Sequence, residues 1–197
     1  MQSLESSGNI PRGCNWPMSL FCAIYKIISN VLANRMKSVL HGIINSSQSS
    51  FLRDRGLLEN IVLANKVVKD LGKGKKSEIV IKVDCGKAYD FVCWDFLYYM
   101  LSRLGFCEKW VSWIRGCLES SLVSVLVNGS PSREFTPSRG LRQGDMITPF
   151  LFLVAVEGLE GLVRKVVRLK KMEGVIVGVN QIEVSLLQFA DGTLVVC

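Results

Sequence analysis

Two short segments carry carboxylates in positions that suit metal chemistry. In IKVDCGKAYD, Asp84 follows a run of β-branched residues, and in QFADGTLVV, Asp191 lies in a turn between two apolar runs. The patterns place one carboxylate at the end of a strand and the other at the tip of a hairpin. Two carboxylates so placed can hold divalent metal ions against a nucleoside triphosphate.

The elements that position these carboxylates follow from the spacing of apolar residues. Helical spacing predicts helices over residues 20–40, 57–71, 94–104, 108–118 and 148–169. The β-branched run 79–83 predicts a strand that ends at Asp84, and Asn128-Gly129 and Asp191-Gly192 each predict a two-residue hairpin turn. We therefore expect an α/β (α+β) fold in which helices cover one face of a largely antiparallel sheet.

The composition of the chain limits the classes of protein to which it can belong. The chain has 197 residues, of which 49% are apolar, so it can bury the core of one domain or of two small ones. Its seven cysteines form no CxxC pair, which favours reduced thiols over a zinc site or a disulfide framework, and His41 is expected at a helix end. We find no secretory signal and no apolar run long enough for a membrane span, and we expect an intracellular protein of the cytoplasm or nucleus.

The charge is basic. Lysine and arginine number 24 against 17 acidic residues, a net charge of +7, which favours an anionic partner such as nucleic acid. Basic residues gather in three clusters, although each cluster could also be an ordinary solvated face. They are Lys73, Lys75 and Lys76; Arg133, Arg139 and Arg142; and Arg164, Lys165, Arg168, Lys170 and Lys171.

Five blocks in order carry a resemblance to a known family. They are WPMSLFCAIYKIISNVLANRMKSVL, QSSFLRDR, IKVDCGKAYDFVCWDFL, SVLVNGSPSREFTPSRGLRQGD and LLQFADGTL. Together the blocks resemble the reverse transcriptase domain of plant non-LTR (LINE-type) retrotransposons. The resemblance implies a right-hand polymerase with an N-terminal tail over residues 1–10, a fingers-like region over 11–76 and a palm over 77–197.

The resemblance also implies the chemistry, which is DNA synthesis on an RNA template. A DNA primer hydroxyl attacks a deoxynucleoside triphosphate, and two Mg²⁺ ions, or Mn²⁺, neutralise the charge on the reacting oxygens. Asp84 matches the first palm carboxylate of the family, with the carbonyl of Cys85 as an additional ligand, and Asp191 matches the first Asp of its FADD box. The expected partners are RNA template, DNA primer and deoxynucleoside triphosphates.

Other matched residues are expected to bind the nucleotide. Tyr89 stands where the family has the aromatic residue that rejects a 2′ hydroxyl, and Arg142, Gln143 and Gly144 match a loop that lines the nucleotide pocket. Arg55 matches a fingers arginine that binds triphosphate. Each residue also has a structural reading: Asp84 as a turn residue, Tyr89 as a core aromatic, the RQG segment as a plain loop, and Arg55 as a surface charge. Asp90 is expected to be structural.

The chain also departs from the family pattern. Gly192 replaces the second Asp of the FADD box, so we expect a severe fall in rate. Four further departures are Trp16, Asp54, Phe91 and Met146. The chain ends soon after Gly192, so we expect no thumb and no processive synthesis, as in a truncated and partly degenerate element.

Three readings stay open: an impaired reverse transcriptase fragment, a nucleic-acid-binding remnant without turnover, and the product of a translated pseudogene. The sequence does not predict an oligomeric state.

Overall fold

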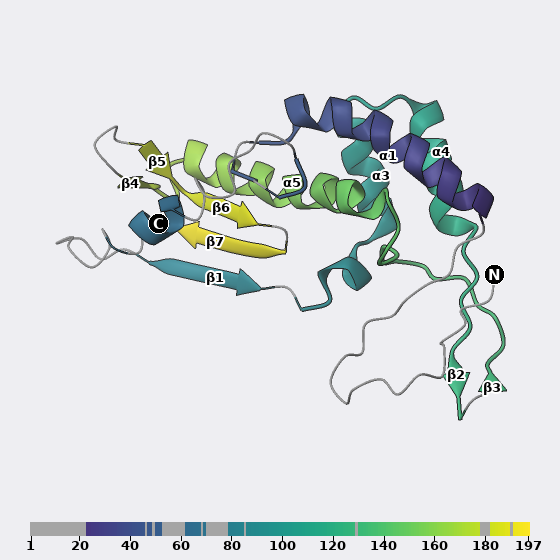
Figure 1. Cartoon of the computed structure of the whole chain (residues 1–197). Coiled ribbons are helices and arrows are strands. Elements are labelled where there is room, and N and C mark those ends of the chain that lie inside the picture. Colours follow the sequence, from purple (N-terminus) through teal and green to yellow (C-terminus); the bar gives the residue numbers. More distant parts are fainter. Residues whose placement is uncertain are drawn as a thin grey trace. The chain divides into compact units, whose positions relative to one another are not determined.

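A computed structural model describes residues 23–45, 47–48, 50–52, 62–67, 69, 79–84, 86–128, 130–177, 182–189 and 191–197. These residues fall into two compact units (Figure 1). Unit 1 comprises Met1–Ser38 and Tyr89–Phe152, and unit 2 comprises Val39–Ala88 and Leu153–Cys197. Each unit is described by itself.

The elements follow one another in a mixed order. The helices are α1 (Ala23–Ile43), the 3-10 helix η1 (Ala88–Phe91), α3 (Trp94–Arg103), α4 (Glu108–Glu119) and α5 (Thr148–Arg168). The strands are β1 (Val80–Asp84), β2 (Leu126–Val127), β3 (Ser130–Pro131), β4 (Val175–Val177), β5 (Ile182–Val184), β6 (Leu186–Phe189) and β7 (Gly192–Val196). Residues 62–67 are also helical.

The predicted elements agree closely with the observed ones. The helices predicted over 94–104, 108–118 and 148–169 and the strand predicted over 79–83 each match an observed element to within about two residues. The helix predicted over 20–40 is α1, which extends to Ile43, and residues 20–22 lie outside the described part of the chain. The helix predicted over 57–71 is helical wherever it is described, and its remaining residues lie outside the described part of the chain.

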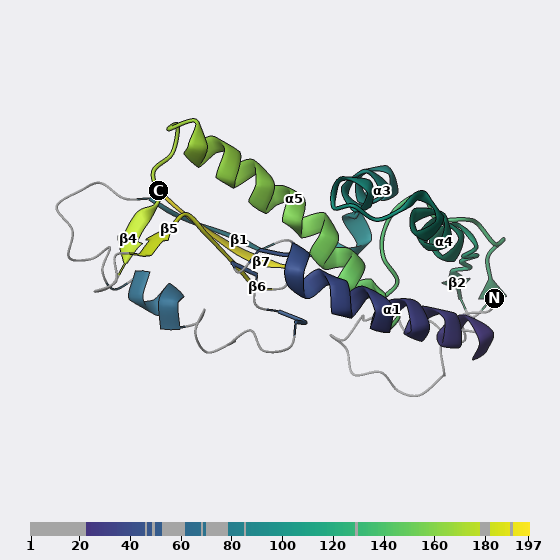
Figure 2. The same cartoon turned by 90° about the horizontal axis from the view of Figure 1, so that it is seen from above.

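Unit 2 is built on a three-stranded sheet in the order β1-β7-β6. Both pairings are antiparallel. The two-stranded β4–β5 ladder of unit 2 and the two-stranded β2–β3 ladder of unit 1 are antiparallel as well. Seen edge-on, the sheet has α5, from Leu153 onward, on one face and the helical segment 62–67 on the other (Figure 2). The predicted combination of helices with an antiparallel sheet is confirmed, with helices on both faces of this sheet.

The core of unit 2 joins the sheet to the segment 62–67. Its buried members are Val67, Val175, Val184, Leu187 and Val196. Val67 and Val196 have no exposed surface at all. Burying a valine side chain contributes about 1.5 kcal/mol or more, so this cluster fixes which face of β7 points towards the helical segment.

One hairpin turn is confirmed and the other is wrong by one residue. Val127 pairs with Ser130, so the chain turns between these two residues as predicted, and Asn128 has the positive φ of 52° that such a turn requires. In the second hairpin Phe189 pairs with Gly192. Asp191 therefore lies in the turn, whereas Gly192 is the first residue of β7, because the Asp-Gly dipeptide signal does not fix the strand register.

Unit 1 takes its core from α1, α3, α4 and the start of α5. On α1 the buried side chains include Leu32 and Met36, whereas Ile24, Ile27 and Val31 of the same apolar pattern are exposed. The apolar face of α1 is therefore wider than the part of that face that the described residues of unit 1 bury.

Among the helices that the structure describes, none combines the length and the apolar character of a membrane-spanning helix.

Gly140 joins two segments of unit 1. Its N–H donates to the carbonyl of Val92 at 2.8 Å, and its own carbonyl accepts from Trp94 Nε1 at 2.7 Å. Its φ is +90°, and an added Cβ would lie 3.0 Å from the carbonyl oxygen of Asp90. Both the backbone conformation and the close approach therefore require glycine.

Replacing Gly140 by alanine should destabilise the protein by about 1 to 2 kcal/mol or more, because the left-handed backbone strains an L-residue. The measurement is urea denaturation followed by circular dichroism. Gly116→Ala is the control, since its Cβ would meet nothing within 4 Å and alanine in a helix should stabilise by about 0.5 to 1 kcal/mol. Equal effects of the two substitutions would contradict this account of Gly140.

Candidate functional site

The pairing of β1 with β7 brings the two predicted metal-binding carboxylates together. Asp84 is the last residue of β1 and lies opposite Gly192, the first residue of β7. Asp191 directly precedes Gly192 in the β6–β7 turn. The two carboxylates therefore lie at the same end of the sheet (Figure 1), and both residues are exposed.

The strand register also decides on which face of the sheet each side chain lies. Side chains directly opposite one another share a face, so Asp84 lies on the face of Gly192 and Phe189. Lys82, two residues earlier and opposite Leu194, shares that face. Leu194 packs against the core that contains Val67 of the segment 62–67. Asp84 is therefore on the face opposite α5.

A pocket of about 380 Å³ opens at this point. Its lining combines the two carboxylates, one lysine and apolar side chains: Ala64, Lys82, Asp84, Leu187, Gln188, Phe189, Asp191, Gly192, Thr193 and Leu194. Lys82 was missed by the sequence analysis, although strand periodicity places it on the face of Asp84. A cation beside two carboxylates can attract phosphate oxygens into the same pocket.

The donor set suits a hard divalent cation. Mg²⁺ is commonly held by one or two carboxylates together with substrate phosphates, and Asp84 and Asp191 supply two carboxylates at one pocket. Among the described residues, no group of three or more His, Cys, Asp or Glu side chains converges on one point. The residues fit a cation whose coordination is completed by substrate, and the two-ion arrangement stays a prediction.

Gly192 is the position at which the sequence analysis expects a missing carboxylate. Because it pairs directly with Asp84, a side chain there would have its Cβ about 4.5 to 5.5 Å from that of Asp84. Gly192 does not have a positive φ, and an added Cβ would approach only the carbonyl oxygen of Phe189, at 3.3 Å. The backbone can therefore accept a side chain here after a small adjustment.

The predicted nucleotide-binding residues that are described lie in unit 1. Tyr89, in η1, stacks on Phe152 with ring centroids 4.5 Å apart and an interplanar angle of 24°. Its carbonyl accepts a hydrogen bond from the N–H of Leu141 at 2.7 Å. The structure thus brings the backbone of Tyr89 beside the segment that continues into Arg142, and a shared nucleotide pocket stays a prediction.

Asp145 anchors this segment to α1. Its carboxylate is buried and accepts hydrogen bonds from Tyr25 Oη, at 2.6 Å, and from Ser29 Oγ. The guanidinium of Arg142 lies 5.0 Å from the centre of the Tyr25 ring, a cation–π contact. Burial, followed by the hydrogen bond to Asp145, raises the pKa of Tyr25 well above its usual 10.0, so this tyrosine remains a donor.

The remaining predicted residues are placed as follows. Gln143 is half-buried and Gly144 is exposed with a φ of +83°, a conformation that favours glycine. Arg55 and Cys85 lie outside the described residues. Asp84 and Asp191 belong to unit 2, and Tyr89, Arg142, Gln143 and Gly144 belong to unit 1.

The Tyr25 and Ser29 contacts of Asp145 were not predicted, because hydrogen-bond partners so distant in sequence leave no local pattern.

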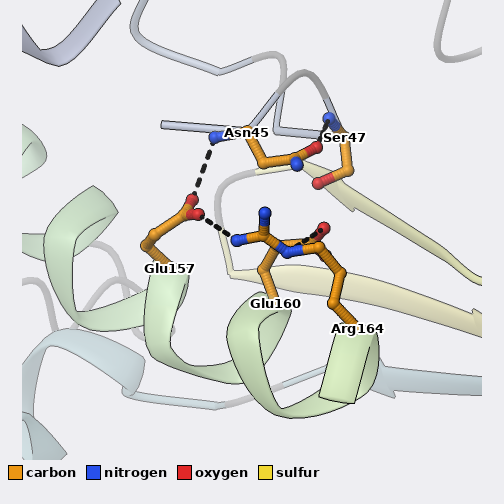
Figure 3. Close-up of polar contacts among 5 residues, drawn as sticks. All are labelled: Asn45, Ser47, Glu157, Glu160 and Arg164. Atoms are coloured by element: carbon orange, nitrogen blue, oxygen red, sulfur yellow. Dashed lines mark hydrogen bonds and ion pairs between the residues drawn. The ribbon is translucent and has the colours of Figure 1, made fainter. Parts of the chain in front are cut away.

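Unit 2 also contains a buried polar cluster that joins α5 to the segment after α1 (Figure 3). Glu157 and Glu160 of α5 are only 6% and 5% exposed. Arg164 donates to Glu157 Oε1 at 3.0 Å and pairs with Glu160 Oε1 at 3.3 Å. Glu157 Oε2 accepts from the N–H of Asn45 at 3.1 Å, and Asn45 Oδ1 accepts from the N–H of Ser47 at 2.9 Å.

The same segment then holds strand β6. The carbonyl of Ser47 accepts a hydrogen bond from the N–H of Gln188 at 3.0 Å, and Gln48 forms a β-bridge with Gln188. Gln188 lies three residues before Asp191. Hydrogen bonds therefore connect Glu157 of α5, through Asn45 and Ser47, to Gln188 of β6, the strand that precedes the turn.

Comparisons with known proteins indicate the family that the chain resembles. A family model described as "Reverse transcriptase (RNA-dependent DNA polymerase)" matches residues 13–197. The Retrovirus-related Pol polyprotein from type-1 retrotransposable element R2 of Popillia japonica is 26% identical over 193 residues, which are 97% of this chain and 26% of the relative. The chain thus spans about a quarter of that relative's length.

Two further proteins extend the comparison. An uncharacterized mitochondrial protein of Arabidopsis thaliana is 43% identical over 68 residues, covering 34% of this chain and 56% of that protein. Among solved structures, apo telomerase from Candida tropicalis superimposes with a TM-score of 0.55 at 12% identity, covering 86% of this chain and 34% of the telomerase chain. At this identity the likeness concerns the fold alone.

Replacing Asp145 by alanine should destabilise the protein by about 2 to 3 kcal/mol, because two buried hydroxyls lose a charged acceptor. The measurement is chemical denaturation. Asp95→Ala, at an exposed position in the first turn of α3, is the control and should cost about 0.5 kcal/mol. Tyr25→Phe should add little in the Asp145→Ala background, and fully additive effects would contradict the proposed network.

The stability contributed by Glu160 should fall as pH rises. Burial is the largest cause that raises the pKa of Glu160 above 4.5, and the charge of Glu157 adds to it, while Arg164 opposes them. The folded state therefore binds this proton more tightly than the unfolded chain, and its advantage is lost above about pH 4.5. Glu160→Gln should gain stability relative to the parent between about pH 5 and about pH 7.

Urea denaturation at the two pH values measures this difference. Glu119→Gln, an exposed glutamate paired with Arg115, is the matched control and should show a smaller change. A relative loss of stability in Glu160→Gln as pH rises would reverse the expected sign and refute the assignment.

Proposed function

Because the chain belongs to the reverse transcriptase (RNA-dependent DNA polymerase) family, we propose that it forms the fingers and palm of an RNA-directed DNA polymerase. The source element is a plant retrotransposon of the non-LTR type. The R2 polyprotein supports the element type, and the Arabidopsis protein supports the plant host. In this proposal residues 1–10 are a tail, 11–76 belong to the fingers and 77–197 to the palm.

One observation carries the proposal: the β1–β7 register sets Asp84 and Asp191 at one end of the sheet, in one pocket. Asp84 and Asp191, with the carbonyl of Cys85, would hold Mg²⁺ or Mn²⁺. The metal would supply neutralisation of charge on the attacking, non-bridging and leaving oxygens of the nucleotidyl transfer. Lys82, on the same face as Asp84, attracts the triphosphate.

The other predicted residues bind and select the nucleotide. The ring of Tyr89, supported by Phe152, excludes a 2′ hydroxyl, and Arg142 binds phosphate oxygens. Gln143 and Gly144 line the nucleotide pocket, and Arg55 binds the triphosphate from the fingers. The partners are an RNA template, a DNA primer and deoxynucleoside triphosphates.

We expect the rate of nucleotidyl transfer to be low because of Gly192. The position opposite Asp84 carries no side chain, so charge close to the cation is reduced where the family has a second Asp. The same observation favours a second candidate function, a domain that binds nucleic acid through its positive charge and does not turn over.

Primer extension on an RNA template with Mg²⁺ or Mn²⁺ tests the proposal. Gly192→Asp should raise the extension rate by at least about tenfold, equivalent to about 1.4 kcal/mol of transition-state stabilisation, because it restores a carboxylate beside Asp84. Gly192→Asn is the matched control: it has the same shape without the charge and should not raise the rate.

The companion variant is Asp84→Ala in the Gly192→Asp background, which should abolish extension. If neither the parent nor Gly192→Asp extends a primer, while RNA binding weakens steeply with salt, the binding domain replaces the polymerase as the conclusion. Fast extension by the parent, unchanged by Gly192→Asp, would refute the predicted impairment.

A further inference from the structure

Helix α5 carries an apolar stripe that unit 2 leaves exposed. Its members are 40%, 62%, 37% and 56% exposed, in the order Leu159, Leu162, Val166 and Leu169. Leu169 directly follows the last residue of α5, and its N–H donates to the carbonyl of Lys165 at 3.0 Å, so it continues the helical ladder. We call these four residues the α5 stripe. The face of α5 that packs within the unit is a different one and includes Leu153, Glu160 and Val163.

The spacing of the α5 stripe is that of a coiled-coil seam. The intervals between its members are three, four and three residues, which is the a-d-a-d pattern of a heptad repeat. Val166 then occupies an a position between leucines at d, a combination that favours pairing of two helices. A helix needs one apolar face to pack in its own unit, and α5 already has that face against the sheet (Figure 2). The stripe therefore fits one further helix.

The charge beside the α5 stripe indicates which kind of helix it fits. Residues 161–172 contain five cations and no acid. One of the five, Arg164, pairs with the buried Glu157 and Glu160. The other four take part in none of the ion pairs that the described residues form: Lys165, Arg168, Lys170 and Lys171. Cations in the last turn also suit the negative end of the helix dipole, but that role does not explain the exposed leucines beside them.

Lys165 has a position that selects a partner. It directly precedes Val166 and so occupies the g position, from which lysine pairs with a glutamate of the facing helix. A second copy of this chain does not supply that glutamate, because residues 161–172 of two copies would bring cations against cations. An anionic membrane would attract the cations, but the stripe lacks the aromatic residues that interfacial helices carry beside leucine.

We propose that the α5 stripe docks an amphipathic helix of another protein, with leucine or valine along its seam and glutamate on the flanking positions. This function goes beyond the proposed polymerase activity, since no residue of the stripe lines the carboxylate pocket. The stripe belongs to the helix on one face of the sheet, and Asp84 lies on the opposite face. The partner therefore binds without covering the pocket.

The first experiment measures fluorescence anisotropy of a labelled synthetic peptide with the full chain. The peptide has about four heptads with valine at a, leucine at d and glutamate at e and g, and repulsion between glutamates keeps it from pairing with itself. One control peptide has lysine at e and g, and the other keeps the glutamates but has serine at a and d. Each control should bind at least about tenfold more weakly, because it lacks either the complementary charge or the apolar seam.

The second experiment changes the seam. Leu162→Ala should weaken binding of the glutamate peptide about tenfold or more, because the most exposed leucine of the stripe would be buried in the complex. Leu162→Met keeps an apolar side chain of similar volume and should retain most of the affinity. Ile176→Ala is the control, since Ile176 is as exposed as Leu162 but lies on β4, and it should bind like the parent. An unchanged melting temperature of Leu162→Ala separates lost docking from lost folding.

The third experiment reverses one charge. Lys165→Glu should weaken binding of the glutamate peptide and strengthen binding of the lysine peptide, because the g position then carries the opposite sign. Lys109→Glu, on α4 of unit 1, makes the same change in net charge away from the stripe and should alter neither affinity by more than about twofold.

No binding of the glutamate peptide, or equal binding of the three peptides, would overturn the proposal. Dimerisation of the parent that Leu162→Ala abolishes, measured by sedimentation equilibrium, would also overturn it and assign the stripe to a second copy. Binding to phosphatidylserine vesicles that Leu162→Ala abolishes would overturn it in favour of a membrane surface.

Discussion

The antiparallel pairing of β1 with β7 is the constraint on which the candidate site depends. It joins carboxylates from distant parts of the sequence, and its register alone decides that Asp84 faces the pocket. A slip of one residue would turn Asp84 towards α5. The register is held at the other end of β7, where Val196 is fully buried in the core with Val67 and Leu187. Apolar packing at the C-terminal end of β7 therefore fixes the position of the carboxylates at its N-terminal end.

Helix α5 contributes to both units through different residues. In unit 1 its N-terminal part supplies Phe152, on which Tyr89 stacks. In unit 2 Glu157 accepts a hydrogen bond from the N–H of Asn45, and the nearby carbonyl of Ser47 accepts one from the N–H of Gln188 in β6. Burying two carboxylates is costly unless they are paired and hydrogen-bonded. Arg164 and the backbone N–H of Asn45 meet that requirement for Glu157, whereas Glu160 keeps one buried oxygen, Oε2, without a hydrogen-bond partner.

Much of the fold could be predicted from local patterns. Helical spacing located α3, α4 and α5, because each helix buries one face. The match of residues 13–197 to the family model confirms that the chain is a reverse transcriptase domain, a prediction that rested on five ordered blocks, whereas the plant origin stays a prediction. The Asp191-Gly192 turn was misplaced by one residue, since a dipeptide does not reveal its strand register. The roles of Asp84, Tyr89 and the residues that bind the nucleotide remain predictions for the experiments to test.

The sequence by itself determined the family, the main elements and the identity of the candidate carboxylates, because these properties are written in short-range patterns and motifs. Only the tertiary structure decided that Lys82 shares the face of Asp84 and that Asp145 binds Tyr25 and Ser29. Gly192 shows both contributions: the sequence identified the missing carboxylate, and the strand pairing placed that position directly opposite Asp84. Contacts between distant segments depend on how whole elements pack, and no local pattern records that packing.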